Sequence, residues 1–184
     1  MTNIWHDVRP ERIRPHDFIA VIEITRGSKN KYELDKETGM LILDRILYTS
    51  THYPANYGFI PRTYAEDNDP LDVLVLCSEE LCSLSLVQCY PIGVIRMIDD
   101  EEVDEKIVAI PFRDPTWNIY QDMGMLPTHI FDEMSHFFEV YKTLENKYTI
   151  VQEVEGRDSA MRIIEQSIRA YNDIFDSYLT GAKL

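Results

Sequence analysis

The sequence predicts an α+β fold that is mainly β, in which helices cover one side of a sheet or barrel. The 184 residues suit one compact domain. Two observations predict the fold class. Apolar runs typical of strands fill the first two-thirds of the chain, and helical periodicity appears only in the last third. Because no internal repeat or linker interrupts the sequence, we expect a single domain over residues 1–184.

The strand candidates are short runs rich in Val, Ile and Leu. A turn-like segment, residues 35–39, separates the second run from the third and predicts a hairpin. Glu23 and Arg45 each interrupt an apolar run, and a charge in such a strand is either exposed or paired. The candidates are residues 18–24, 31–34, 40–47, 73–76, 87–97 and 107–110.

The helix candidates repeat apolar residues every three or four positions. Residues 130–144 form one such stripe, and a second one runs from Asp158 to Phe175. Asp158 is a predicted N-cap, and Gly181 stands where a C-terminal glycine is expected. The C-terminal part of the chain is therefore predicted to be helical.

The charge balance excludes several classes of function. Acidic residues number 32 against 18 basic ones, so the formal net charge is −14. Nucleic acids and anionic membranes need clustered positive charge, and we expect neither as a partner. No apolar stretch approaches the roughly 20 residues of a membrane helix. An anionic substrate stays possible if divalent cations mediate its contact with the protein.

The cysteines and the N-terminal residues favour a cytoplasmic protein. The three cysteines are an odd number and show neither a CxxC pair nor a zinc-ligand spacing. Residues 1–14 contain no apolar core of a secretory signal. We therefore expect reduced thiols and a cytoplasmic location.

Residues 67–72, with the sequence DNDPLD, are the most informative part of the chain. Three carboxylates fall within six residues, and Pro70 favours a loop because proline has no N–H for a sheet. Such carboxylates repel one another unless a cation neutralises them. Oxygen ligands suit Mg²⁺ when waters and a substrate phosphate complete its shell. The glycine and glutamate of an EF-hand loop are missing, so a magnesium site of another kind is predicted.

A second acidic cluster, residues 99–106, joins two predicted strands. A charged hairpin loop explains most of its residues without a metal. Asp99 and Asp104 differ because they flank the loop at the strand ends. There they can converge with residues 67–72 if the strands are neighbours.

Cations and phenols form a set complementary to these carboxylates. Carboxylates that hold Mg²⁺, together with Lys, Arg and Tyr that hold phosphate oxygens, describe a phosphoryl-transfer site. No Walker A sequence is present, which disfavours an ordinary NTPase. Exposed strand faces or aromatic packing also explain some members, Tyr53 and Lys31 among them. The set is Lys31, Arg45, Tyr53, Tyr57, Lys106, Tyr141 and Lys142.

Several motifs in a shared order resemble the soluble family I inorganic pyrophosphatases, in particular their short prokaryotic members. Residues 67–73 resemble the aspartate signature of that family. The resemblance runs from about residue 23 to residue 142. The other matching motifs are residues 31–33, 44–45, 53–58, Asp99 with Asp104 and Lys106, and residues 141–142.

The resemblance implies a five-stranded OB-like β-barrel with flanking helices, and Mg²⁺-dependent hydrolysis of inorganic pyrophosphate to two phosphates. It implies a homo-oligomer, a hexamer, and several Mg²⁺ ions per active site. Asp69 matches the residue that helps deprotonate the attacking water. The implied metal ligands are Glu23, Asp67, Asp72, Asp99 and Asp104. The implied substrate ligands are Lys31, Arg45, Tyr57, Lys106, Tyr141 and Lys142, of which Lys31, Arg45 and Lys106 also assist catalysis. Glu33 and Tyr53 have supporting roles.

Two alternatives stay open at this point. An OB-like barrel also suits an oligonucleotide-binding module, although the net charge counts against it. Another metal-dependent phosphoryl-transfer enzyme, such as one acting on a nucleotide-sugar, could use the same aspartates.

Overall fold

The computed structural model describes residues 3–99 and 102–179, with side chains through residue 175. The strands are β1 (Ile13–Arg14), β2 (Asp17–Ile24), β3 (Asn30–Leu34), β4 (Leu41–Ile46), β5 (Asn56–Phe59), β6 (Asp72–Val75), β7 (Leu86–Asp99), β8 (Glu102–Pro111) and β9 (Thr149–Gly156). The α-helices are α1 (Ile4–Asp7), α2 (Thr128–Val140) and α3 (Arg157–Leu179). Short 3₁₀ turns lie at Pro10–Arg12, Met123–Met125 and Thr143–Glu145. The predicted α+β class, mainly β with a C-terminal helix, is confirmed.

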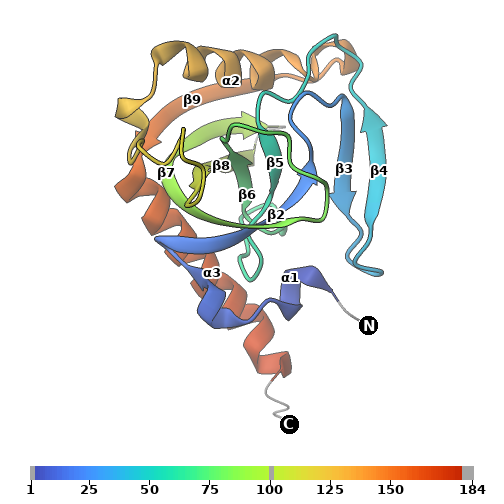
Figure 1. Ribbon diagram of the computed structural model, residues 1–184. Coiled ribbons are helices and arrows are strands. Elements are labelled where there is room, and N and C mark those ends of the chain that lie inside the picture. The colour runs from blue at the N-terminus through green and yellow to red at the C-terminus, as the bar shows by residue number, and fades with distance from the viewer. Residues whose placement is uncertain (1–2, 100–101, 180–184) are drawn as a thin grey trace.

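Within the described residues, five strands close into a ring in the order β2, β5, β6, β8 and β7, with β7 pairing back onto β2 (Figure 1). Among the strand pairs that the described residues form in this ring, only β6–β8 is parallel. Strand β9 extends the sheet beyond β7, and β3 with β4 forms a separate hairpin beside the ring. The predicted five-stranded, barrel-like arrangement is confirmed, whereas its likeness to an OB fold stays a prediction.

Gly58 lets β5 approach β2 closely enough to close the ring. It pairs with Ile22, and a Cβ atom at this position would lie 1.8 Å from the carbonyl oxygen of Val21. We expect Gly58→Ala to destabilise the protein by about 3 kcal/mol or more, because the backbone of β2 must move away. Urea unfolding measures this loss.

Gly124→Ala is the matched control for Gly58→Ala. A Cβ atom at Gly124 would meet only Asp122 Oδ1, at 3.4 Å. We expect it to cost less than about 1 kcal/mol. If both variants lose the same free energy of unfolding, the close packing of β5 against β2 at Gly58 does not contribute to stability.

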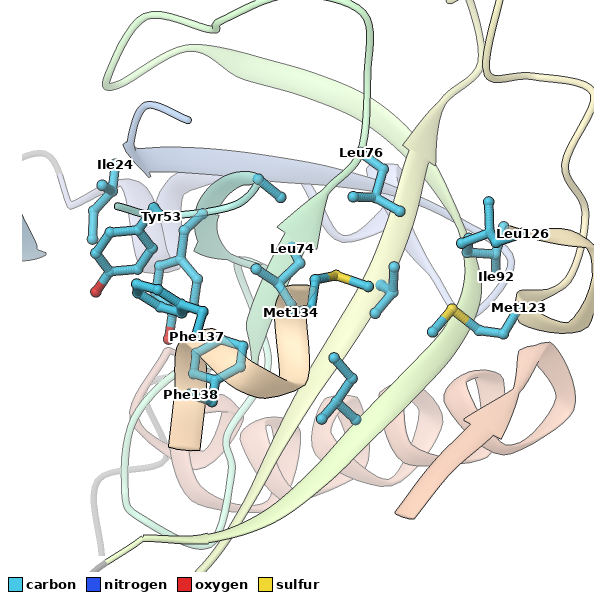
Figure 2. Packing of buried hydrophobic residues seen from close by; sticks show 14 of the residues in the cluster. Ile24, Tyr53, Leu74, Leu76, Ile92, Met123, Leu126, Met134, Phe137 and Phe138 are labelled. Atoms are coloured by element: carbon cyan, nitrogen blue, oxygen red, sulfur yellow. The ribbon is translucent and has the colours of Figure 1, made fainter. Parts of the chain in front are cut away.

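Two helices cover different parts of the ring. The side chains of Met134, Phe137 and Phe138 on α2 pack toward Leu74 of β6, as Figure 2 shows. The N-terminal half of α3 packs elsewhere, where Ile164 joins a second buried cluster with β2, β7 and β8. Burial of these apolar surfaces is the main force that holds the helices against the strands.

The structure also corrects parts of the secondary-structure prediction. Strands β1, β5 and β9 and helix α1 were not predicted. The first helix candidate, residues 130–144, ends as a helix at Val140. Asp158 lies in the first turn of α3 and is not its N-cap, because the helix begins at Arg157. The acidic residues 102–105 belong to strand β8 and not to a loop. Gly181 lies outside the described residues.

No helix in the described part of the chain is long and apolar enough to span a membrane.

Candidate functional site

A pocket of about 240 Å³ lies between the ring and the β3–β4 hairpin, and charged side chains of both signs line it. Every predicted metal ligand lines this pocket, as do Asp69 and Glu33. Of the predicted substrate ligands, all but Arg45 line it, and Tyr53 lies outside its lining. The predicted residues that it brings together are Glu23, Lys31, Glu33, Tyr57, Asp67, Asp69, Asp72, Asp99, Asp104, Lys106, Tyr141 and Lys142.

Lys106 is the buried cation of this pocket, with only 3% of its side chain exposed. The parallel pairing of β6 with β8 places Lys106 beside Asp72 in register. Its Nζ donates to Asp72 Oδ2 at 2.7 Å, to Asp104 Oδ1 at 3.0 Å and to the Tyr57 hydroxyl at 3.1 Å. Burial alone would lower the pKa of Lys106, but Asp104 and Asp72 raise it well above its usual value. Lys106 therefore carries its charge inside the protein.

Tyr57 completes this network because its hydroxyl donates to Asp72. Burial raises the pKa of Tyr57 well above its usual value, so it acts as a neutral donor. Tyr53 packs behind it, with ring centroids 5.3 Å apart, and also contacts Phe137 on α2. The position of Tyr53 agrees with the packing alternative considered for it.

Three carboxylates of the pocket, those of Glu23, Asp67 and Asp104, have raised pKa values, and burial is the main cause. Burial, followed by the charge of Asp72, raises the pKa of Glu23 to about 8. Burial and the neighbouring carboxylates raise the pKa of Asp67 to about 6, against a hydrogen bond from the Asp69 amide. Burial is also the main cause of the raised pKa of Asp104, which Lys106 opposes. Negative charge is therefore in excess here, and a divalent cation would relieve it.

This donor set fits Mg²⁺ held largely through water. Among residues 3–99 and 102–175, no three His, Cys, Asp or Glu side chains are placed to ligate one metal ion together. Mg²⁺ usually keeps several waters and takes only one or two carboxylates plus substrate phosphates. Hard carboxylate oxygens spread around a pocket suit that mode of binding.

The raised pKa of Glu23 predicts how the stability of the metal-free protein depends on pH. The folded protein keeps this proton up to about pH 8, whereas the unfolded chain releases it near the ordinary value of 4.5. The folded state therefore binds more protons between these values, and its stability falls as the pH rises through this window. Glu23→Gln keeps the oxygen that accepts the Leu34 amide and removes the titration.

We expect the melting temperature of the metal-free wild type to fall more than that of Glu23→Gln between about pH 5 and pH 8. Scanning calorimetry in the presence of a chelator measures both. Parallel pH profiles for the two proteins would contradict the assignment of a buried, protonated Glu23.

A second pair of predicted residues meets at the other side of the pocket. Lys142 forms an ion pair with Asp99, and Asp99 Oδ1 accepts a hydrogen bond of 3.2 Å from the Thr149 hydroxyl. The Lys142 ammonium also lies 5.4 Å from the ring centroid of Tyr141. Tyr141 is buried, and burial raises its pKa. These contacts place Lys142 at the pocket with its charge toward the acidic residues.

Arg45 is positioned by residues that the sequence analysis gave no role. It lies opposite Lys31 in the hairpin, and its Nε donates to Glu145 Oε1 at 3.0 Å. Asp44 pairs with both Arg45 and Lys31. Glu145 could have been noticed only through its nearness in sequence to residues 141–142, since its partner is 100 residues away.

Comparison with known proteins identifies the family. The family model described as inorganic pyrophosphatase matches residues 20–172. The chain is 44% identical to soluble inorganic pyrophosphatase 2 of Chlamydomonas reinhardtii over 169 residues, which is 92% of this chain and 88% of the relative. It is 46% identical to soluble inorganic pyrophosphatase 1 of Arabidopsis thaliana over 167 residues, or 91% and 79% of the two chains.

Solved structures agree with this result. The inorganic pyrophosphatase of Helicobacter pylori superposes with a TM-score of 0.84 at 43% identity, covering 87% of this chain and 96% of that one. The inorganic pyrophosphatase of Thermus thermophilus superposes with a TM-score of 0.85 at 35% identity, covering 93% and 99%. Sequence and fold together show that this chain belongs to the inorganic pyrophosphatase family.

Proposed function

We propose that this chain hydrolyses inorganic pyrophosphate to two phosphates and that it requires several Mg²⁺ ions. The observation that carries this proposal is the pocket in which carboxylates with raised pKa values stand beside lysines and tyrosines. Membership of the inorganic pyrophosphatase family supports the same reaction. Bound Mg²⁺ would lower the pKa of a coordinated water and offset negative charge on the phosphates.

In this proposal one set of residues binds Mg²⁺ and another set binds the phosphates. Glu23, Asp67, Asp72, Asp99 and Asp104 would hold Mg²⁺ through their carboxylate oxygens or through water. Lys31, Arg45, Tyr57, Lys106, Tyr141 and Lys142 would donate to the phosphate oxygens. Glu33, which pairs with Lys31, and the packed ring of Tyr53 would support these groups.

Asp69 would accept the proton of the attacking water. It lines the pocket, and its carboxylate is about half exposed, so a water can reach it. The lysines and Arg45 would stabilise the charge that grows on the departing phosphate. Lys106 suits this task because its charge is held inside the protein by two carboxylates.

Arg45→Ala tests the division between substrate and metal ligands. We expect the Michaelis constant for pyrophosphate to rise at least about tenfold, because one charge-assisted contact is lost, while Mg²⁺ binding changes less. Steady-state kinetics and Mg²⁺ titration measure the two effects. A larger effect on Mg²⁺ than on pyrophosphate would remove Arg45 from the substrate ligands.

Phosphate release from three substrates tests the proposed function. The purified protein is incubated with pyrophosphate, ATP or a nucleotide-sugar, each with Mg²⁺ and each with a chelator. We expect rapid release from pyrophosphate with Mg²⁺ and little from the other two, since the pocket has room for a small polyanion. Preference for ATP or a nucleotide-sugar would favour the other class of phosphoryl-transfer enzyme.

The proposal also covers the cellular location of the protein, its domain organisation and its oligomeric state. We place the protein in the cytoplasm, which its three unpaired cysteines, Cys77, Cys82 and Cys89, support. We infer one domain over residues 1–184 and a homohexamer, with no nucleic-acid or membrane partner. Size-exclusion chromatography with light scattering tests the assembly.

A further inference from the structure

Lys36 lines the pocket and forms an ion pair with Asp69, the proposed proton acceptor. Lys36 follows strand β3, in the turn that leads to β4, whereas Asp69 lies in the loop that leads into β6. The ion pair therefore joins the hairpin wall of the pocket to the wall that carries the aspartates. Nothing in the proposed reaction so far uses Lys36.

The N-terminal segment holds Lys36 from its other side. The Lys36 ammonium lies 5.7 Å from the centroid of the Trp5 ring, a cation–π contact. The side-chain amide of Asn3 donates to the Lys36 carbonyl oxygen at 2.8 Å. Trp5 is itself buried, and its Nε1 donates to the Thr63 carbonyl oxygen at 2.9 Å. Trp5 thus contacts both the hairpin and the start of the loop that carries Asp69.

The backbone of Asp69 is fixed by its own loop. Its amide donates to Asp67 Oδ1 at 3.0 Å, and its carbonyl oxygen accepts from the Ala65 amide at 2.8 Å. With the backbone held in this way, the Asp69 carboxylate can still rotate about its side-chain bonds. Lys36 contacts Oδ1 of that carboxylate, and Oδ1 is shielded from solvent.

We propose that Lys36 is a positioning residue that holds Oδ1 of Asp69 and so presents Oδ2 to the attacking water. This inference rests on the proposed hydrolysis of pyrophosphate with Asp69 as the proton acceptor. The Lys36 and Asp69 side chains are 51% and 48% exposed. A pair this exposed contributes little to folding stability. We therefore infer that the ion pair between Lys36 and Asp69 acts by orienting the Asp69 carboxylate.

Steady-state kinetics on the full chain test the inference. We expect Lys36→Met to lower kcat roughly tenfold, as the loss of an orienting partner typically does, with little change in KM for pyrophosphate. Lys36→Arg restores most of the rate because it keeps the charge. In the Asp69→Asn background, Lys36→Met causes no further loss, since the group that it orients is already gone.

Arg169→Met is the matched control, because it also replaces a long cation by methionine. Arg169 is 71% exposed on α3 and pairs with Glu165 away from the pocket. We expect its kcat and KM to equal those of the wild type.

Trp5 fluorescence gives a second readout that needs neither metal nor turnover. In a Trp117→Phe background, Trp5 is the remaining tryptophan. We expect Lys36→Met to change its emission, because the ammonium leaves the ring. Asp69→Asn also changes it, because Lys36 loses its partner, and the double variant matches Lys36→Met alone.

Several outcomes would overturn the inference. A raised KM with an unchanged kcat would make Lys36 a phosphate ligand and not a positioning residue. Additive losses of Lys36→Met and Asp69→Asn, or unchanged Trp5 emission in both, would also contradict it. A wild type that releases no phosphate from pyrophosphate would defeat the proposed function instead, while the fluorescence arm would still test the ion pair.

Discussion

Asp69→Asn is expected to lower the turnover of pyrophosphate by about 10²- to 10⁴-fold, the usual contribution of a general base. Asparagine has nearly the same shape but cannot take a proton from water. The Asp69 amide and carbonyl keep their hydrogen bonds in this variant, so residues 65–69 are expected to hold their shape. Phosphate release at saturating Mg²⁺ and pyrophosphate measures the effect on turnover.

Two further measurements make the Asp69 result specific. Mg²⁺ titration is expected to give similar affinity for Asp69→Asn and the wild type, because Asp67 and Asp72 are unchanged. Asp132→Asn makes the same chemical change at an exposed position on α2 and is expected to be fully active. Near-wild-type turnover of Asp69→Asn would remove Asp69 from the base role.

Lys106→Met is expected to cost the metal-free protein about 3–5 kcal/mol of stability, because it leaves the buried partners of a charge pair uncompensated. Lys106 contacts Asp72 and Asp104 at 2.7 and 2.9 Å, and these carboxylates would then face each other without a cation. Phosphate release is expected to fall at least about 100-fold, because a preorganised donor to the phosphate is lost. Urea unfolding and phosphate release measure the two effects.

Added Mg²⁺ distinguishes the electrostatic cause of this loss from simple loss of packing. The unpaired carboxylates gain a cation when Mg²⁺ binds, so part of the lost stability of Lys106→Met is expected to return. Adding Asp104→Asn to Lys106→Met removes one negative charge and is expected to stabilise the metal-free protein relative to Lys106→Met alone. If neither Mg²⁺ nor Asp104→Asn raises the stability of Lys106→Met, the charge network around Lys106 does not stabilise the pocket.

The parts of the fold that the sequence could predict are those with a strong local pattern. The apolar run of β2, which only Glu23 interrupts after Asp17, and the helical stripe that contains Phe137 and Phe138 were both confirmed. Strand β5 was missed because Pro54 and Gly58 dominate that segment, although Gly58 is there to allow close strand packing. Strand β9 was missed because apolar and polar residues do not alternate in its sequence, TIVQEVEG. Local patterns therefore failed where tertiary packing decided the structure.

For the candidate site too, the sequence predicted the residues that cluster locally and missed the contacts between distant segments. The clustering of Asp67, Asp69 and Asp72 within six residues predicted one wall of the pocket, and the pocket does contain all three. The contacts of Lys36 with Asp69 and Trp5, and of Arg45 with Glu145, could not be predicted. Each joins segments that only the folded chain brings together.

The most direct test of this account is the structure of the protein with Mn²⁺ in place of Mg²⁺ and a non-hydrolysable diphosphonate in place of pyrophosphate. The account predicts anomalous peaks beside Asp67, Asp72 and Asp104, with the diphosphonate held by Lys31, Arg45 and Lys142. Metal ions bound elsewhere on the surface, or a diphosphonate outside this pocket, would contradict it.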